Sequence, residues 1–508
     1  MSAAVAIPTQ PTESVFRPAL LLMCGRTLAF AATFFIPMVL VRVFDPALFG
    51  TYKQLFLIYS TVYLIAQLGM STSLYYFLPQ APHEAGRYAA NSMLFLGTAG
   101  LACFGALIVA APKLAHWLNN SELPRYVPWI GAYIFLQMLS SALEIVLVSR
   151  GQYFRASACY ALSDIVRAAA FLVPVLVFHQ LSWLLKGAVF VALLRVLLTV
   201  FYFRREFRGG FTPDLALFKR QLAYALPFAA AVLVEIVQAS LPQYVVSHWF
   251  DPATFAIFAV GCLQIPLVEF AAAPTSDVMM VKMQEKLAVG RKPAVLAIWL
   301  DTTWKLALLF FPLVVFCVIA ARQIIVLLFT AKYVASVPIF IAWSTMTLLS
   351  TLQVDGVMRV FAQTRFLLAL NVMRLVIIAG LLKWSLAEFG LLGPALAIVL
   401  ATLAFKAAAL IRMKKLLDIS AAQLLPWGSM AALLAASAGA GVAAWAVKSQ
   451  MHAATVPLLL AMGLVFTIAY TALVWHFGLL NSEEKLAVAR WARKLQARTA
   501  GAFAYGRE

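Results

Sequence analysis

Charged side chains are scarce in this chain of 508 residues. Asp, Glu, Lys and Arg make up 12% of it, apolar residues make up 64%, and the mean hydropathy is +0.91. Soluble domains hold roughly 25% charged and 45–50% apolar residues. This composition therefore excludes an ordinary soluble protein. Acidic residues are the rarer kind, with 20 Asp and Glu against 39 Lys and Arg.

Cysteines and long polar loops are rare as well. The five cysteines fall singly in apolar runs, without the paired spacing of a metal site, and we interpret them as small packing residues: Cys24, Cys103, Cys159, Cys262 and Cys317. The longest expected outer connections, around 112–126 and 321–336, are only about fifteen residues and hold no paired carboxylates. Membrane enzymes that build polysaccharides usually carry a large outer loop or a catalytic acidic motif outside the membrane. Neither is found in this sequence, so we expect no catalytic residues, no metal and no cofactor.

Long apolar runs fill the rest of the chain, for example at 54–79, 88–112, 333–354 and 419–447. About 20 apolar residues are enough for one helix to cross a bilayer. Lipid tolerates only helices and closed barrels, and the alternation typical of barrel strands is missing. The sequence therefore predicts an all-α polytopic membrane protein with about fourteen transmembrane helices. The opening residues, which include Glu13, lack a removable signal peptide, so the first helix, about residues 16–44, is expected to stay.

The basic excess carries a topology signal. With a cytoplasmic N-terminus, the expected inner loops hold 17 Lys and Arg and the outer loops hold five. This asymmetry follows the positive-inside rule. We therefore expect a multi-pass protein of the bacterial cytoplasmic membrane, with both termini in the cytoplasm and no nucleic-acid partner.

One short phrase occurs twice. FDPALFGTY begins at Phe44 and FDPATFAIF at Phe250, 206 residues later. Three weaker matches follow in the same order: Leu143 with Leu352, Arg167 with Arg374, and Gly187 with Gly393, at spacings of 209, 207 and 206 residues. Six expected helices separate the copies, so the halves share one orientation. Parallel repeats of this kind are typical of transporters that work by alternating access.

The duplication predicts five segments. They are a cytoplasmic N-terminal segment (1–15), a first six-helix bundle (16–208), a second six-helix bundle (209–416), a segment (417–481) with two additional transmembrane helices at about 425–447 and 456–477, and a basic amphipathic tail (482–508). The tail is expected to lie on the inner leaflet rather than to bind a partner protein. Within the repeated phrase, Asp45 and Asp251 are predicted to start helices, because Asp-Pro suits a helix N-terminus.

The region VLVRVFDPALFGTYKQLFLIYSTVYLIAQLGMSTSLYYFLPQ and the later EFGLLGPALAIVL carry a family resemblance. The first, with its Arg, helix break and Phe-Gly-x-Tyr, resembles the first two helices of bacterial polysaccharide biosynthesis flippases, and the second resembles the entry to their twelfth helix. These proteins belong to the multidrug, oligosaccharidyl-lipid and polysaccharide exporter (MOP) superfamily. The resemblance spans about residues 16–416.

The resemblance implies a flippase that moves a polyprenyl-diphosphate-linked oligosaccharide from the inner to the outer leaflet. Its product would serve surface polysaccharides such as lipopolysaccharide or exopolysaccharide, and its partners would be membrane lipids, a polysaccharide polymerase and assembly proteins. A peptidoglycan lipid-precursor flippase and a multidrug antiporter of the same superfamily remain alternatives. The antiporter is disfavoured because the first helix carries Arg26 and no carboxylate.

Basic residues inside the membrane are the candidate substrate ligands, because a buried charge there is costly and a diphosphate requires cations. We select Arg26, Lys53, Arg167 and Arg374. The last two occupy matched positions of the duplication at a spacing of 207 residues. Separate structural roles for them stay open, since Arg167 can pair with Asp164 one turn away.

Acidic residues inside the membrane are the candidates for coupling to a proton or sodium gradient. Glu235 is the first choice because no basic residue lies three or four positions from it. A neutral, protonated Glu235 is the competing interpretation. Glu144 and Asp355 are further candidates for ion coupling or gating. By contrast, Asp301 and Lys305 are expected to neutralise one another, and Lys406, like other lysines near helix ends, to reach the interface.

Overall fold

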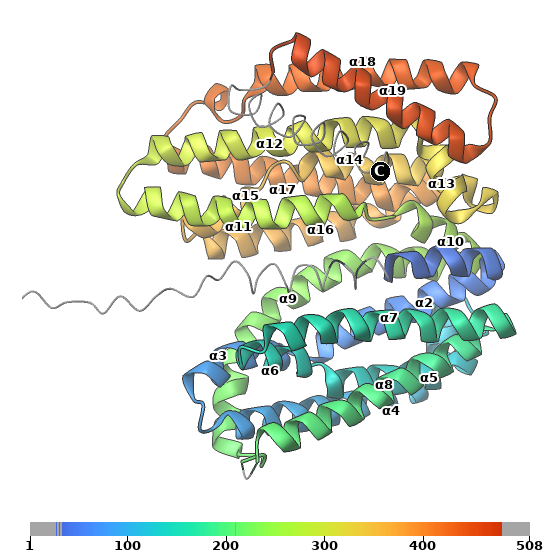
Figure 1. Ribbon diagram of the computed structural model, residues 1–508, viewed down its shortest axis with the longest axis vertical. Coiled ribbons are helices and arrows are strands. Elements are labelled where there is room, and N and C mark those ends of the chain that lie inside the picture. The colour runs from blue at the N-terminus through green and yellow to red at the C-terminus, as the bar shows by residue number, and fades with distance from the viewer. Residues whose placement is uncertain (1–26, 28–29, 31–32, 209, 480–508) are drawn as a thin grey trace, which may run out of the picture. The chain divides into compact units, whose positions relative to one another are not determined.

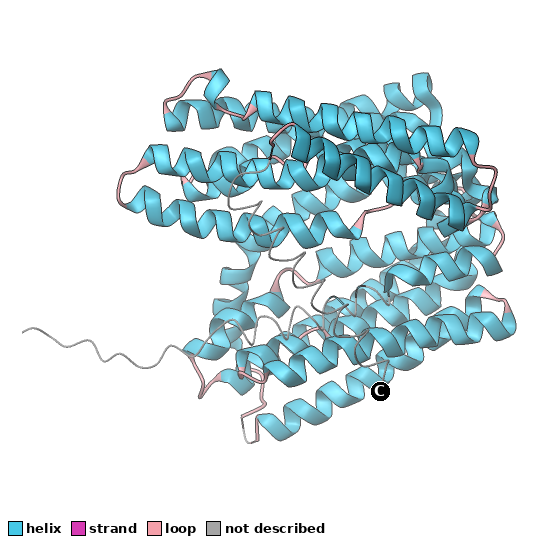
Figure 2. Ribbon diagram, turned by 45° about the horizontal axis from the view of Figure 1, so that its top comes forward, coloured by secondary structure: helices cyan, strands magenta, loops and turns pink. Residues whose placement is uncertain are grey.

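The structure is a computed structural model that describes residues 27, 30, 33–208 and 210–479. Within these ranges the regular elements are all helices (Figure 2). Ten of the described helices are long and apolar enough to cross a membrane, or up to 12 if each of two bent pairs is one span. The all-α polytopic fold is confirmed. The count of fourteen stays a prediction, because the first expected helix lies largely outside the described residues.

The helices follow one another along the chain as labelled in Figure 1. A short helix, Thr33–Val43, comes first. The others are α2 (Pro46–Ala66), α3 (Met70–Gln80), α4 (Ala85–Trp117), α5 (Leu123–Ser140), α6 (Leu143–Ser149), α7 (Tyr153–Phe178), α8 (Leu181–Glu206), α9 (Leu215–Trp249), α10 (Pro252–Gly261), α11 (Pro266–Ala288), α12 (Lys292–Ile319), α13 (Ala321–Phe329), α14 (Val337–Leu349), α15 (Val354–Val360), α16 (Thr364–Phe389), α17 (Gly393–Leu417), α18 (Trp427–Gln450) and α19 (Thr455–His476), with short 3₁₀ turns at Ala331–Ser336, Gly390–Leu392 and Ala421–Gln423.

The chain packs as two compact units. Unit 1 contains the residues up to Val260 together with Ile378–Pro394. Unit 2 contains Gly261–Ile377 together with the residues from Ala395 onward. The segment borders inferred from the duplication, at 208 and 416, remain predictions.

The repeated Phe-Asp-Pro-Ala phrase starts a helix in both copies. The backbone N–H of Leu48 donates to Asp45 Oδ1 at 2.8 Å, and the N–H of Thr254 lies 3.4 Å from Asp251 Oδ1. Each Asp is followed by Pro at the first helical position, where a missing N–H leaves no helical bond unmade. The prediction that both Asp residues start helices is confirmed.

The two phrases also contact one another within unit 1. A Cβ atom added at Gly50 would lie 1.8 Å from the carbonyl oxygen of Pro252, so only glycine permits this approach. Buried amides lie beside this contact: Gln54 Nε2 donates to Ser247 Oγ at 2.8 Å, and Asn120 Nδ2 donates to Gln54 Oε1 at 2.6 Å. These bonds join α2 to α9 and to the loop before α5, and they satisfy polar groups that lipid would leave unpaired.

The other helices of unit 1 pack around α5 and α8. Helix α5 contacts α4, α8 and α2, and α7 contacts α8. Gly187 brings α8 close to α7, since an added Cβ there would lie 2.2 Å from the carbonyl oxygen of Ala170. Small residues at such crossings are typical of membrane helix pairs, because dispersion contacts rather than water exclusion hold these helices together.

Unit 2 contains the last two helices. Helices α18 and α19 pack on each other, and both contact α12. Their bounds agree within three residues with those expected from the sequence, 425–447 and 456–477. A buried indole anchors the preceding loop, since Trp299 Nε1 donates to the carbonyl of Leu424 at 2.8 Å. The predicted basic tail from residue 482 lies outside the described residues.

The helix boundaries fix how the two copies align from α6 and α15 onward. Helices α7 and α16 are both 26 residues long and begin 211 residues apart. Each follows a seven-residue helix, α6 or α15. Left-handed residues also recur at this spacing: Gly151 and Ala362 precede the two long helices, and His179 and Gly390 follow them.

This register corrects the three later matches inferred from the sequence, since Leu143 then corresponds to Val354 and Gly187 to Ile398. At a spacing of 211 residues, Arg374 corresponds to Ser163 and not to Arg167, which lies one helical turn further along α7. The spacing of 207 inferred from the sequence is therefore wrong for these helices. Apolar helix sequences resemble one another in several registers, whereas breaks and left-handed residues fix a single one.

Candidate functional site

A cavity of about 480 Å³ lies between α2 and α9 in unit 1. One face of α2 lines it through residues spaced three or four apart, beginning with Lys53 and continuing through Leu57, Ser60 and Leu64. Helix α9 contributes Glu235 and a few apolar and polar neighbours. Two residues that the sequence singled out for different roles thus line the same cavity, within the size range of small-molecule sites.

Lys53 is held among aromatic rings. Its Nζ atom lies 5.5 Å from the centroid of the Phe49 ring and 6.0 Å from that of Tyr52. Both rings lie on the same helix, and their faces attract a cation. Lys53 is therefore suited to present a positive charge to the cavity.

Glu235 is an exposed residue in the part of α9 that follows a bend. The segments Leu215–Pro227 and Val232–Trp249 meet at 53°, and the proline at the end of the first segment accounts for the bend. No ion pair joins Glu235 to another described residue. Its carboxylate lines the cavity, where a cation can reach it.

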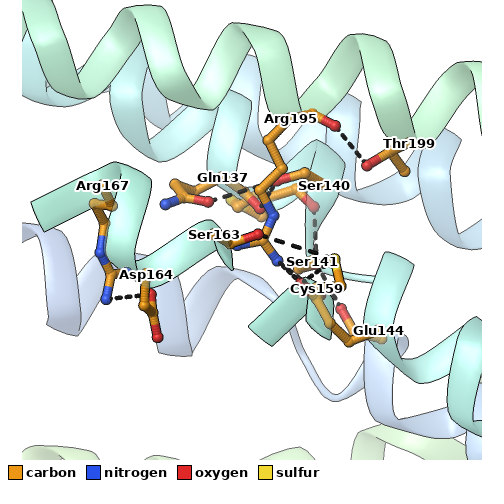
Figure 3. A network of polar contacts seen from close by, with 12 residues as sticks. Gln137, Ser140, Ser141, Glu144, Cys159, Ser163, Asp164, Arg167, Arg195 and Thr199 are labelled. Atoms are coloured by element: carbon orange, nitrogen blue, oxygen red, sulfur yellow. Dashed lines mark hydrogen bonds and ion pairs between the residues drawn. The ribbon is translucent and has the colours of Figure 1, made fainter. Parts of the chain in front are cut away.

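A second group of polar residues in unit 1 contains Glu144 (Figure 3). Glu144 is the second residue of α6 and is almost completely buried. Arg195 Nη2, from α8, lies 2.6 Å and 2.7 Å from its two carboxylate oxygens. The thiol of Cys159, from α7, donates to the same carboxylate at 3.4 Å. Glu144 therefore joins three helices, and Cys159 is more than the simple packing residue we expected.

Arg167 lies on α7 near this group. Its Nη2 atom lies 2.6 Å from Asp164 Oδ1 and donates to Thr33 Oγ1 at 3.0 Å. The internal pair that the sequence left open is therefore present. An incoming anion must compete with Asp164 for this guanidinium, which weakens the case for Arg167 as a primary ligand.

Tyrosines surround these charges. The ring of Tyr59 lies 5.4 Å from that of Tyr63 and 5.0 Å from that of Tyr133. The amide of Gln137 donates to the hydroxyl of Tyr133 at 2.7 Å. The inner face of α2 thus presents phenols toward α5, and it provides a polar surface without adding formal charge.

Unit 2 contains a matching ion pair. Lys406 Nζ, from α17, lies 3.0 Å from Asp355 Oδ2, from α15, and also donates to the carbonyl of Leu352 at 2.9 Å. Lys406 is therefore paired with a carboxylate, and its expected reach to the interface stays a prediction. In both units the partners stand 51 residues apart in sequence, and the acidic residue is the second residue of the short helix.

The remaining predicted residues are spread over the chain. Arg374 is half-buried on α16, in the part of that helix assigned to unit 2. Arg26 lies outside the described residues. The exposed pair of Asp301 and Lys305 is present at 2.7 Å, as expected. The structure therefore brings Lys53 and Glu235 to one cavity and gives Glu144, Asp355 and Arg167 charged partners.

Arg195 is a residue that the sequence did not single out among the basic residues inside the membrane. A usable signal existed in the equal 51-residue spacing of Glu144 from Arg195 and of Asp355 from Lys406. That spacing becomes meaningful only once the duplication is aligned on its helix breaks.

Comparisons with known proteins agree with this architecture. The family model described as polysaccharide biosynthesis protein matches residues 39–338, more than half of the chain. The solved structure of the lipid II flippase MurJ, in an inward closed conformation, has a TM-score of 0.67 at 13% identity, covering 89% of this chain and 98% of that one. An inward-facing multidrug resistance transporter of the MATE family has a TM-score of 0.62 at 14% identity, covering 79% and 98%.

A transporter of the MOP superfamily from Pyrococcus furiosus, described as having a binding pocket of reverse polarity, has a TM-score of 0.53 at 14% identity; the match covers 80% of this chain and 95% of that one. No curated protein sequence matches. At identities of 13–14% the structural matches establish the fold. The family model, which matches more than half of the chain, establishes the family that the sequence resembles. The chain belongs to the polysaccharide biosynthesis protein family and has the fold of the flippases and transporters of the MOP superfamily.

Proposed function

We propose that this protein is a flippase for a polyprenyl-diphosphate-linked oligosaccharide, which it moves from the inner to the outer leaflet by alternating access. The observation that carries the proposal is the cavity between α2 and α9, to which Lys53 contributes a cation in a chain of the polysaccharide biosynthesis family. A diphosphate is the part of such a cargo that lipid excludes most strongly. Lys53 offers it a charge-assisted hydrogen bond inside the protein.

Glu235 is the proposed site of ion coupling. It lines the same cavity as Lys53, so the charge of its carboxylate acts directly on the headgroup. Protonation, or binding of a sodium ion, removes the negative charge that would repel a diphosphate. Binding of the cation and of the headgroup therefore favour one another, and this coupling is reciprocal.

The other predicted residues take secondary roles under this proposal. Arg26, Arg167 and Arg374 remain candidate ligands along the path of the headgroup. Glu144 and Asp355 are candidates for gating, because opening either ion pair frees the short helix that carries the acidic residue. No covalent step, metal or organic cofactor is needed, since translocation changes only the position of the cargo.

The cellular setting is proposed on the same basis. Both termini lie in the cytoplasm and the protein spans the bacterial inner membrane, as the Lys and Arg distribution favours. Its product would supply a polymerase and assembly proteins for lipopolysaccharide or exopolysaccharide. The similarity in fold to a lipid II flippase makes a peptidoglycan precursor the second candidate cargo.

Reconstituted vesicles test the proposal. Purified protein is incorporated into liposomes containing a fluorescent polyprenyl-diphosphate oligosaccharide, and an added glycosidase reports how fast the label reaches the outside. We expect protein-dependent flipping that falls about tenfold or more in Lys53→Ala, because one charge-assisted contact is lost, and recovers partly in Lys53→Arg. Lys186→Ala is the matched control, since Lys186 lies over the Trp183 ring on α8, outside the lining of the cavity.

Two results would contradict this proposal, the first in its function and the second in its site. One is absence of flipping with every lipid-linked oligosaccharide tried, including a peptidoglycan precursor, while a cationic drug is transported. The other is flipping that is unchanged in folded Lys53→Ala, which would retain the transport activity but remove this cavity from it.

A further inference from the structure

A second cavity, of about 500 Å³, lies within unit 2. It is bounded by the start of α11 and the non-helical residues before it, and by the end of α14 and the residues after it. Its lining consists of Leu263, Gln264, Ile265, Val268, Ala272, Ala273, Trp343, Met346, Thr347, Ser350 and Gln353. None of these side chains is charged, so the cavity suits neither a diphosphate nor a cation.

The cavity lies beside two interruptions of helical structure. Residues 263–265 precede α11, and residues 350–353 separate α14 from α15. Non-helical backbone within a spanning segment is tolerated where it is buried in protein or lines a polar cavity, and transporters commonly build their sites there. The location thus favours a binding site over a packing defect.

Unit 1 also has a pair of interruptions, at residues 67–69 between α2 and α3 and at residues 141–142 between α5 and α6, and a hydroxyl contact joins them. There, Ser71 is the second residue of α3, and its hydroxyl lies 2.9 Å from that of Ser141, which directly follows α5. In unit 2 the second residue of α11 is Leu267, and the residue directly after α14 is Ser350. Leucine cannot make the bridge, and Ser350 instead lies 3.4 Å from the carbonyl of Met346 in its own helix.

The side chains of this cavity match the chemistry of a sugar. Trp343 is half-buried and supplies a flat apolar face, on which the C–H side of a pyranose ring can stack, and an N–H donor at its edge. Gln353 is held by a 2.6 Å bond from its Nε2 to the carbonyl of Ser350. That bond uses a donor of the amide and leaves its oxygen to accept from a hydroxyl. Gln264 and Thr347 add further neutral donors and acceptors.

We propose that this cavity is a subsite for an uncharged sugar residue, with Trp343 as its stacking platform and Gln264 and Gln353 as its hydrogen-bonding groups. The assignment of this sugar to the cargo's oligosaccharide rests on the proposed flippase function. The subsite itself requires only the geometry of unit 2. It assigns the recognition of sugar to residues different from those that face the diphosphate.

Binding of free sugars tests the subsite without any transport step. Detergent-solubilised full-length protein is mixed with a panel of unphosphorylated di- and trisaccharides containing hexoses and N-acetylhexosamines, and saturation-transfer NMR reports which sugar protons touch the protein. We expect transfer to at least one member, with binding about tenfold weaker in Trp343→Ala, nearly retained in Trp343→Phe, and reduced in Gln353→Leu. Trp445→Ala is the matched control, since Trp445 is 59% exposed on α18 of the same unit.

A flipping assay then separates the two proposals. Folded Trp343→Ala, verified by an unchanged elution volume and circular dichroism spectrum, should move the oligosaccharide-linked lipid more slowly and the sugar-free polyprenyl diphosphate at the wild-type rate. Equal slowing of both lipids, or no saturation transfer to any sugar in the wild type, would overturn the subsite. Loss of flipping of every lipid in the wild type, with sugar binding intact, would overturn the flippase function and leave the subsite standing.

Discussion

Removing one partner of the buried pair between Glu144 and Arg195 should destabilise unit 1 strongly. The side chain of Glu144 is 4% exposed, and both its oxygens lie within 2.7 Å of Arg195 Nη2. Glu144→Gln leaves Arg195 charged and without its carboxylate, and breaking a buried pair in this way costs about 3 to 5 kcal/mol. Arg195→Gln should also be strongly destabilising, because it leaves the buried carboxylate of Glu144 without its guanidinium partner.

The double variant measures the interaction energy between Glu144 and Arg195, apart from the contacts that each side chain makes with other residues. Because both single changes remove the same interaction, Glu144→Gln/Arg195→Gln should cost less than the sum of the two, with a coupling energy of about 2 kcal/mol.

The measurement is reversible unfolding in mixed micelles, followed by far-ultraviolet circular dichroism as the denaturing detergent fraction rises. Asp355→Asn provides the comparison in unit 2, where Asp355 is 40% exposed and a solvated pair contributes about 0 to 1 kcal/mol. If the loss of unfolding free energy in the double variant equals the sum of the losses in the two single variants within about 0.5 kcal/mol, the two side chains do not act as one buried unit.

Three other changes give distinct outcomes. Gly187→Ala should destabilise the protein by about 1 to 3 kcal/mol because its Cβ would meet the carbonyl oxygen of Ala170, whereas Gly105→Ala, with open space around it, should not; the same unfolding assay checks both. Asp45→Ala should cost about 1 kcal/mol through the lost cap of α2, and an unchanged midpoint would show that Pro46 alone starts the helix. Glu235→Gln should abolish any increase in binding of a diphosphate lipid on acidification, measured by isothermal titration at several pH values; a retained pH dependence would assign the effect to another group.

The sequence predicted those features that depend on local composition. Apolar runs identified the spans, and the last two helices appear within three residues of their expected bounds. Asp-Pro identified two helix starts because a cap and a fixed φ act within one turn. The ion pair of Asp164 and Arg167 was foreseen for the same reason, since its partners are three residues apart on one helix.

The breaks inside the spans could not be predicted in this way. The chain leaves α2 at residues 67–69, where Leu68 and Gly69 both have positive φ, and no proline marks the place. A leucine in this conformation is unfavourable by itself and is retained by surrounding contacts, such as the Ser71 to Ser141 bond. Long-range partners were missed for the same reason, because the sequence does not show which faces of α6 and α8 meet.

The duplication explains why the two units share a framework and yet differ in chemistry. Each unit has a short helix after a break, and each ties that helix to another 51 residues away by an acidic and a basic residue. In unit 1 the breaks are bridged by hydroxyls and the nearby charges are buried. In unit 2 an uncharged cavity lies beside breaks at residues 263–265 and 350–353. Two copies of one unit can take different tasks in this way, because a break in a helix can be sealed by side-chain bonds in one copy and leave room for a ligand in the other.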